Sequence, residues 1–366
     1  MSHAQTPQPS AGADITWSDP ARASQFTTWL AQLAPSHSLH IQSLRLASAD
    51  ASFRRYFRID GCLSNSEKRQ KPISFIIMDA PPDKENCQPF VKVAGLMHAA
   101  GIRAPQVLAW DEPLGFMLLT DLGAQTMMQV INRAEPQANL PLYLQAVDTL
   151  IAWQLSSKPD VLPPYDQALL SRELALFPDW YIIQHKGMAI DDAMRFTLDN
   201  TFKQIITTVL TQPSVYVHRD FMPRNLMVGE RLGVLDFQDA VYGPITYDIA
   251  SLMRDAFLSW DEDFCLDVTI RYWEKARKAG LPVGDDFGEF YRGVEWMCLQ
   301  RHLKVAGIFA RLTLRDGKPQ YLADTPRFIN YIRSTCARYR ELKPLLRLVD
   351  KLEGIVEPDI FGFGRQ

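Results

Sequence analysis

One stretch of the chain carries the residue types that phosphoryl transfer requires. Residues 215–228 read VYVHRDFMPRNLMV, and residues 234–238 read VLDFQ. They contain a His-Arg-Asp triplet, an asparagine five residues after the aspartate, and an Asp-Phe pair. A carboxylate can accept the proton of an attacking hydroxyl, while a second carboxylate and an amide oxygen suit the magnesium ions that neutralise phosphate charge. We therefore predict a catalytic site of Asp220, Asn225 and Asp236, with the last two as magnesium ligands.

The residues between these motifs predict how they are held. Two short apolar runs, 226–228 and 234–236, flank a turn that contains glycine at both ends, which predicts a hairpin with Asn225 and Asp236 side by side. The alternative is that the polar residues only satisfy a tight loop, because Asp and Asn are favoured there. The full succession of motifs favours catalysis. His218 is expected to order the loop by hydrogen bonding rather than to act as a base.

Composition limits the classes of protein. The chain has 366 residues, 47% of them hydrophobic, which is enough for a sizeable core and two lobes. Its formal net charge of -3 and lack of long basic runs give no case for a nucleic-acid or membrane-surface partner. The first residues, MSHAQTPQPSAGAD, do not resemble a signal peptide, and no run approaches the ~20 apolar residues of a membrane span. We expect a cytoplasmic protein, and no protein partner is indicated.

Hydrophobic periodicity predicts an α+β fold in two parts. Residues 1–14, rich in Pro, Ser, Ala and Gln, are expected to be disordered, and Ser18-Asp19-Pro20 starts a helix. Strands are predicted at 40–47, 54–59, 73–78, 105–108 and 115–119, with one helix around 90–97. Amphipathic helical stretches follow at 140–156, 191–211, 247–258, 261–279, 287–312 and 325–350. We place a sheet-rich lobe at 15–120 and a helical lobe at 121–366.

The motifs HRDFMPRNLMV and VLDFQDAVYGPITYDIASLMRDAF resemble those of the aminoglycoside phosphotransferase superfamily. Within it, the chain is most similar to the anomeric kinases of N-acetylmuramate and N-acetylglucosamine from bacterial cell-wall recycling. The similarity extends over nearly the whole chain, including 52–58, 78–82, 176–180 and 296–312. It implies a two-lobed protein-kinase-like fold, ATP with Mg2+, and Asp248 as a partner that steadies the catalytic loop. From the residues alone, Asp248 equally suits the helix dipole at a helix start.

The nucleotide end departs from the family pattern. The turn at 48–52 contains no glycine, although its small residues, Ser52 among them, can let backbone N–H groups approach phosphate. Asp121 and Leu122 lie where the family's hinge pairs with adenine. Gln238 occupies the place of the glycine in the Asp-Phe-Gly motif, which casts doubt on flipping of that segment but not on magnesium binding by Asp236.

A second departure is the missing phosphate-binding lysine. Met78 lies near its expected position, and Phe90 or Val91 lies near that of its glutamate partner. Because both halves of the ion pair are absent, neither charge is left alone. Arg54 and Arg58 share one face of a strand by alternation, and we predict that one of them binds phosphate. The alternative is that they are solvated or pair with Asp60 and Asp79.

The acceptor site is expected in the helical lobe. Asp179, Trp180 and Arg301 are candidates for substrate binding, and Phe177, Trp296, Gln300, His302 and Lys304 lie in the same segments. Trp296 is expected in the core because aromatic residues at helical spacing usually pack there. Arg301 or Lys304 can meet the lactyl carboxylate of N-acetylmuramate. The favoured alternative for these two is an exposed helical face.

The sequence and the resemblance together predict an ATP-dependent kinase that phosphorylates the anomeric hydroxyl of N-acetylmuramate and N-acetylglucosamine. A kinase of another small molecule, such as an aminoglycoside or a choline-like amine, is the nearest alternative. A polycationic acceptor requires a strongly acidic cleft, whereas residues 296–304 are net basic. A nucleotide-binding pseudokinase scaffold is the third alternative, motivated by the missing lysine, glutamate and glycines. Retention of Asp220, Asn225 and Asp236 argues against it.

Overall fold

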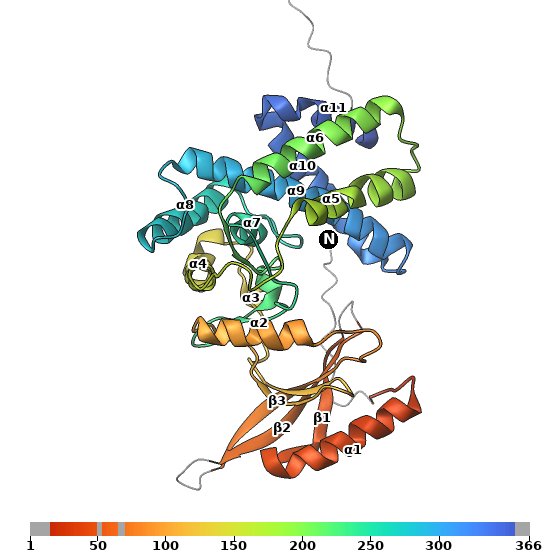
Figure 1. Ribbon diagram of the computed structural model, residues 1–366, viewed down its shortest axis with the longest axis vertical. Coiled ribbons are helices and arrows are strands. Elements are labelled where there is room, and N and C mark those ends of the chain that lie inside the picture. The colour runs from red at the N-terminus through yellow and green to blue at the C-terminus, as the bar shows by residue number, and fades with distance from the viewer. Residues whose placement is uncertain (1–14, 50–52, 65–69, 356–366) are drawn as a thin grey trace, which may run out of the picture. The chain divides into compact units, whose positions relative to one another are not determined.

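The computed structural model describes residues 15–49, 53–64 and 70–355 (Figure 1). The chain divides into two compact units, one formed by Met1–Thr126 and Leu226–Asp239 and the other by Met127–Asn225 and Ala240–Gln366. The predicted disordered segment at 1–14 and the predicted nucleotide contact at Ser52 lie outside the described residues. The α+β fold class is confirmed.

The first unit is built on a five-stranded antiparallel sheet with strand order β1-β2-β3-β5-β4. The strands are β1 (Leu39–Ala49), β2 (Arg55–Ser64), β3 (Gln70–Asp79), β4 (Val107–Asp111) and β5 (Phe116–Thr120). Helix α1 (Pro20–His37) begins as predicted, where the Asp19 side chain accepts a hydrogen bond from the Ala21 N–H. Figure 1 shows α1 on one side of the sheet and α2 (Gln88–Ala99) on the other.

Strand alternation assigns the two faces of this sheet. Phe57 and Ile77 pair across β2 and β3 and are fully buried against α1, in a cluster with Phe26. Their neighbours Tyr56 and Met78 are also a cross-strand pair and therefore point to the opposite face. Because side chains alternate along β2, its polar residues are divided between the two faces in the same way.

The predicted hairpin after the catalytic loop is confirmed, and it belongs to the sheet-containing unit. Strands β7 (Leu226–Met227) and β8 (Gly233–Val234) pair antiparallel. The Val234 N–H donates to the Arg103 carbonyl, and the Phe237 ring lies 4.9 Å from the Phe90 ring. These contacts attach residues 226–239 to the first unit, although the sequence analysis placed them in the helical part.

The second unit is mainly helical. Its short elements include β6 (Ser214–Val217), the 3-10 turn η3 (Pro223–Asn225) and β9 (Val241–Pro244), and β6 pairs with β9. Its helices before β9 are α3 (Met127–Val130), α4 (Leu140–Leu155), α5 (Gln167–Leu176), the π-helix η2 (Phe177–His185) and α6 (Asp192–Leu210). Those after β9 are α7 (Tyr247–Met253), α8 (Glu262–Lys278), α9 (Phe287–Leu314), α10 (Thr325–Arg338) and α11 (Lys343–Glu353). In the described part, no helix is both long and apolar enough to cross a bilayer.

Helix α9 runs through the core of the second unit and corrects one prediction. Trp296 is buried, as expected. Arg301 and Lys304, for which an exposed helical face was favoured, are only 4% and 7% exposed. The prediction was wrong because α9 is packed by other helices on nearly all sides over this stretch. The stretch predicted at 325–350 is likewise two helices, α10 and α11, interrupted at Tyr339 by extended backbone.

Candidate active site

The predicted catalytic loop, residues 218–225, follows β6 and is bound by Asp248 in the first turn of α7. The Asp248 carboxylate is fully buried and accepts hydrogen bonds from the backbone N–H groups of His218, at 2.7 Å, and Arg219, at 3.0 Å. Arg219 has φ +78°, a left-handed conformation that costs a non-glycine residue free energy and persists only where the surroundings impose it. Burial raises the pKa of Asp248 to about 6, although the nearby His218 and the two N–H groups oppose that rise.

Asp220 and Asn225 lie on this loop in the second unit. The Asp220 side chain is half-buried, and its N–H donates to His218 Nδ1 at 3.2 Å. The Asn225 Nδ2 donates to the Asp220 carbonyl at 2.9 Å, which orients the amide. The bond from the Asp220 N–H is of the kind expected of a loop-ordering His218, and that role stays a prediction.

Asp236 follows β8 in the first unit. It has φ +62°, another strained non-glycine conformation, and its side chain is half-buried. Gln238 Nε2 donates to Asp236 Oδ1 at 2.9 Å. The residue that replaces glycine in the Asp-Phe-Gly motif therefore contacts the predicted magnesium ligand. That Asp236 acts beside Asn225 stays a prediction.

A buried carboxylate that the sequence analysis missed lies behind the catalytic loop. Glu173 of α5 is 5% exposed and accepts hydrogen bonds from Tyr165 Oη, Arg219 Nη2, Gln300 Nε2 and Lys304 Nζ. Burial alone raises the pKa of this carboxyl, but the charges of Lys304 and Arg219 outweigh burial and lower it to about 2. Glu173 therefore joins α5, α9 and the catalytic loop through one charge.

Arg301, a predicted substrate contact, is the second clamp on this loop. Its Nη1 donates to the Arg219 carbonyl at 2.7 Å, and its guanidinium lies 4.7 Å from the centre of the Tyr247 ring. Arg219 is thus held at its backbone N–H, its carbonyl and its guanidinium, by Asp248, Arg301 and Glu173 respectively. These contacts account for how the loop keeps a strained conformation next to Asp220.

The predicted nucleotide contacts of the first unit have partners that the sequence did not indicate. Arg58 Nε lies 2.6 Å from Asp121 Oδ2, and Arg58 Nη2 donates to the Gly123 carbonyl at 2.8 Å. Ser74 Oγ also donates to Asp121. Burial raises the pKa of Asp121, but the bonds from Arg58 and Ser74 outweigh it and lower the pKa. Leu122, the other predicted hinge contact, is buried.

Arg54 and Arg58 do not make the ion pairs suggested as the alternative to phosphate binding. Asp60 pairs with Arg45, and Asp79 with Arg22 and Arg55. Arg54 instead lies 3.0 Å from Glu85, in the loop between β3 and α2. The suggestion failed because strand alternation places Arg55, not Arg54, on the face that carries Asp79.

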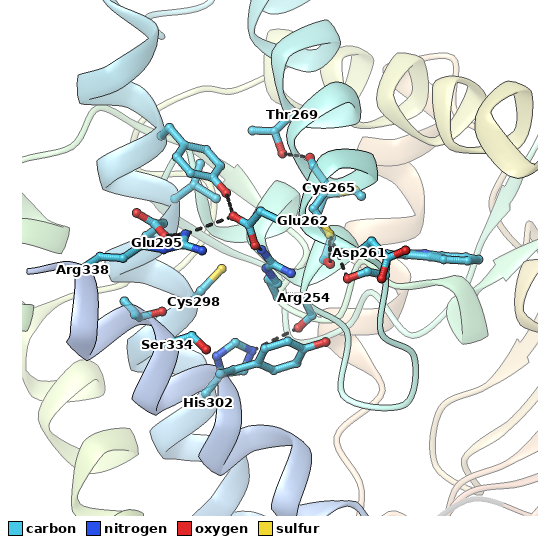
Figure 2. A pocket seen from close by; sticks show the side chains of 16 residues that line it. Arg254, Asp261, Glu262, Cys265, Thr269, Glu295, Cys298, His302, Ser334 and Arg338 are labelled. Atoms are coloured by element: carbon cyan, nitrogen blue, oxygen red, sulfur yellow. Dashed lines mark hydrogen bonds and ion pairs between the residues drawn. The ribbon is translucent and has the colours of Figure 1, made fainter. Parts of the chain in front are cut away.

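A cavity of about 300 Å³ lies in the second unit among α8, α9 and α10 (Figure 2). Two of its three carboxylates are ion-paired, because Glu262 pairs with Arg254 and Arg338, and Arg338 also bonds Glu295. Burial lowers the pKa of the wall residue His302 to about 3, so its ring is neutral near pH 7. Aromatic side chains at 260, 291 and 331 complete the wall. The predicted acceptor residues Asp179 and Trp180 lie on η2 and do not line this cavity.

Comparisons with known proteins identify the family and the fold of the chain. Residues 43–286 match the phosphotransferase enzyme family. The chain is 47% identical over 335 residues to the N-acetylmuramate/N-acetylglucosamine kinase of Neisseria meningitidis serogroup B, covering 91% of this chain and 96% of that protein. It is 45% identical over 343 residues to the protein of the same name from Pseudomonas aeruginosa, covering 92% and 98%. Plasmodium vivax ethanolamine kinase shares the fold, with a TM-score of 0.57 at 10% identity over 90% of each chain.

Proposed function

The chain belongs to the phosphotransferase enzyme family, and we propose that it transfers the γ-phosphoryl group of ATP to the anomeric hydroxyl of N-acetylmuramate and N-acetylglucosamine. The product is the sugar 1-phosphate, formed in cell-wall recycling. The observation that carries this substrate class is 45–47% identity, over more than nine-tenths of the chain, to two kinases with that name. The reaction class is further supported by the retention of Asp220, Asn225 and Asp236.

We assign the catalytic roles from residue chemistry and local contacts. Asp220 orients the acceptor hydroxyl and takes its proton as the oxygen attacks phosphorus. Its position depends on the strained backbone of Arg219, which Asp248 and Arg301 hold. The amide of Asn225 and the carboxylate of Asp236 are hard oxygen donors of the kind that magnesium prefers. Magnesium held by such donors would neutralise charge on the phosphates.

The cavity in Figure 2 suits the uncharged polar groups of an amino sugar, its ring hydroxyls and its N-acetyl group. Glu262 and Glu295 are each engaged by Arg338, so a cationic ligand has to compete with existing ion pairs. Hydroxyl and N-acyl groups can bond to such a wall without breaking those pairs, and aromatic faces can cover a sugar ring. A polycationic aminoglycoside gains little here, because these two carboxylates are already neutralised.

The test is ADP release with Mg2+ and ATP over a panel of N-acetylmuramate, N-acetylglucosamine, an aminoglycoside and choline, followed by phosphorus-31 NMR of the product. We expect stimulation by the two amino sugars and a resonance of an anomeric phosphate. Asp220→Asn serves as the folded control and should lower turnover by about 100-fold or more. Stimulation only by choline or the aminoglycoside would replace the proposed substrate. No stimulation by any compound would favour the scaffold alternative.

A further inference from the structure

Five arginines in the described part of residues 20–60 lie on or beside the sheet, and each has a carboxylate partner. Arg22 and Arg55 both bind Asp79 on the α1 face. Arg45 pairs with Asp60 at a half-exposed position. Arg58 binds Asp121 and the Gly123 carbonyl, so it holds the backbone of residues 121–123. The remaining one is Arg54, whose carboxylate partner is Glu85.

Glu85 contacts both Arg54 and the residue before it. One carboxylate oxygen, Oε2, lies 3.0 Å from Arg54 Nη2, and the other, Oε1, accepts the Phe53 N–H at 3.2 Å. The two side chains are only 10% and 13% exposed. A single carboxylate therefore sets both the backbone just before Arg54 and the direction of its guanidinium. Such a pre-oriented cation loses little conformational entropy when it binds an anion.

Strand register places Arg54 close to the position of the missing lysine. Tyr56 of β2 pairs with Met78 of β3, which lies near that position, and Arg54 is two residues before Tyr56, directly before the first residue of β2. Residues two apart on a strand are separated by roughly 7 Å, which an arginine side chain can span. Met78 itself is fully buried and apolar. Arg54 is therefore within reach of the place where β3 of other kinases carries the lysine.

The glutamate partner of that lysine is missing as well. In kinases a glutamate on the helix after β3 orients the lysine. Here the corresponding helix, α2, carries Phe90 or Val91 near that position, and neither can pair with a cation as a carboxylate does; the Phe90 ring packs against Phe237. Glu85 precedes α2 in the loop from β3, and it is the residue that orients Arg54. An arginine fork has five N–H donors, so it can bind a carboxylate and a phosphate together.

We propose that Arg54 binds the α and β phosphates of the nucleotide and that Glu85 is its positioning residue, the two replacing the usual lysine and glutamate. This proposal rests on the use of a nucleotide donor in the proposed function. It does not depend on the identity of the acceptor, because nucleotide binding is measured without any sugar. Failure of the sugar assay and failure of this proposal are therefore distinguishable.

The test compares the affinities of ADP and adenosine, measured by calorimetry with Mg2+ on the full chain. Arg54→Gln should lower the affinity for ADP by about 10- to 100-fold, which corresponds to the loss of one or two charge-assisted hydrogen bonds. The affinity for adenosine should be unchanged. Arg54→Lys should retain part of the ADP affinity because it keeps the charge. Glu85→Gln should show a smaller loss for ADP alone, since it misdirects the guanidinium without removing it. Arg45→Gln is the matched control, from which both affinities should be unaffected.

Arg58→Gln separates the two candidates on the same face. Because Arg58 holds residues 121–123, its replacement should lower the affinities for ADP and for adenosine to the same degree. The proposal is overturned if Arg54→Gln weakens both ligands equally, or if only Arg58→Gln is selective for ADP. If Arg54→Gln does not fold, as judged by thermal unfolding, the ratio of ADP affinity to adenosine affinity is measured for Arg54→Lys and Glu85→Gln instead. If both of these variants have the same ratio of affinities as the wild-type protein, the proposal is also rejected.

Discussion

Replacing Glu173 by glutamine tests whether one buried charge holds the catalytic loop. The substitution keeps the shape of the side chain but leaves Arg219 and Lys304 buried without their shared anion. The net charge of these three side chains changes from +1 to +2. Removing one partner of a buried ion pair costs about 3 to 5 kcal/mol. The lowering of the Glu173 pKa from 4.5 to about 2 corresponds to a similar value, about 3 kcal/mol.

This contribution has a defined pH window. Because the folded-state pKa is lowered, the stabilisation is fully present above pH 4.5 and is lost as the pH falls towards 2. At pH 7 we expect Glu173→Gln to lower the free energy of unfolding, from urea titrations followed by tryptophan fluorescence, by about 3 to 5 kcal/mol. Turnover should fall more than the affinity for ATP does, because the group that is released, Arg219, precedes Asp220 in the loop.

Two further variants make the result decisive. Adding Lys304→Met to Glu173→Gln returns the cluster to a charge of +1 and should recover part of the lost stability. Asp267→Asn is the control, because it breaks an exposed i,i+4 pair with Arg271 that is expected to contribute only about 0.3 to 0.5 kcal/mol. If Glu173→Gln costs no more than this control, or if the double variant is less stable than the single one, the charge argument is refuted.

Three other outcomes are expected. Gly307→Ala places a Cβ 2.3 Å from the Leu176 carbonyl oxygen, so α9 has to separate from the C-terminal end of α5, and thermal unfolding should show a loss of at least ~1 to 3 kcal/mol; an unchanged melting temperature would contradict the close approach. Burial raises the pKa of Asp248 from 3.8 to about 6, so the folded protein binds more protons in that range and stability falls by about 3 kcal/mol as the pH rises through it; Asp248→Asn should flatten this part of the stability–pH curve. Ser334→Phe fills part of the 300 Å³ cavity and should raise KM for the amino sugar by about 10-fold or more without changing ADP affinity; equal KM values would remove the cavity from acceptor binding.

Local sequence signals were sufficient for the strands of the sheet and most of the helices, although not for α5 and η2, and they revealed the catalytic motif. Period-2 runs predicted the five strands of the sheet, and Asp19 predicted the start of α1. The hairpin of β7 and β8 followed from two apolar runs around a turn. In each case the interacting residues are close in the chain, so their types and spacing are visible in a single window. The order of Asp220, Asn225 and Asp236 is a signal of the same local kind.

The contacts that hold the catalytic loop were decided by the tertiary structure. Glu173 binds Arg219, 46 residues away, and Gln300, 127 residues away, and no local pattern marks an α5 glutamate for either contact. Arginine side chains are usually exposed, and Arg301 is buried only because helices distant in sequence enclose α9. The cost of burying a charge is met by partners from other elements, so its function depends on packing that the primary sequence does not display. The sequence did not distinguish Arg54 from Arg58 for the same reason, because their partners, Glu85 and Asp121, come from other elements.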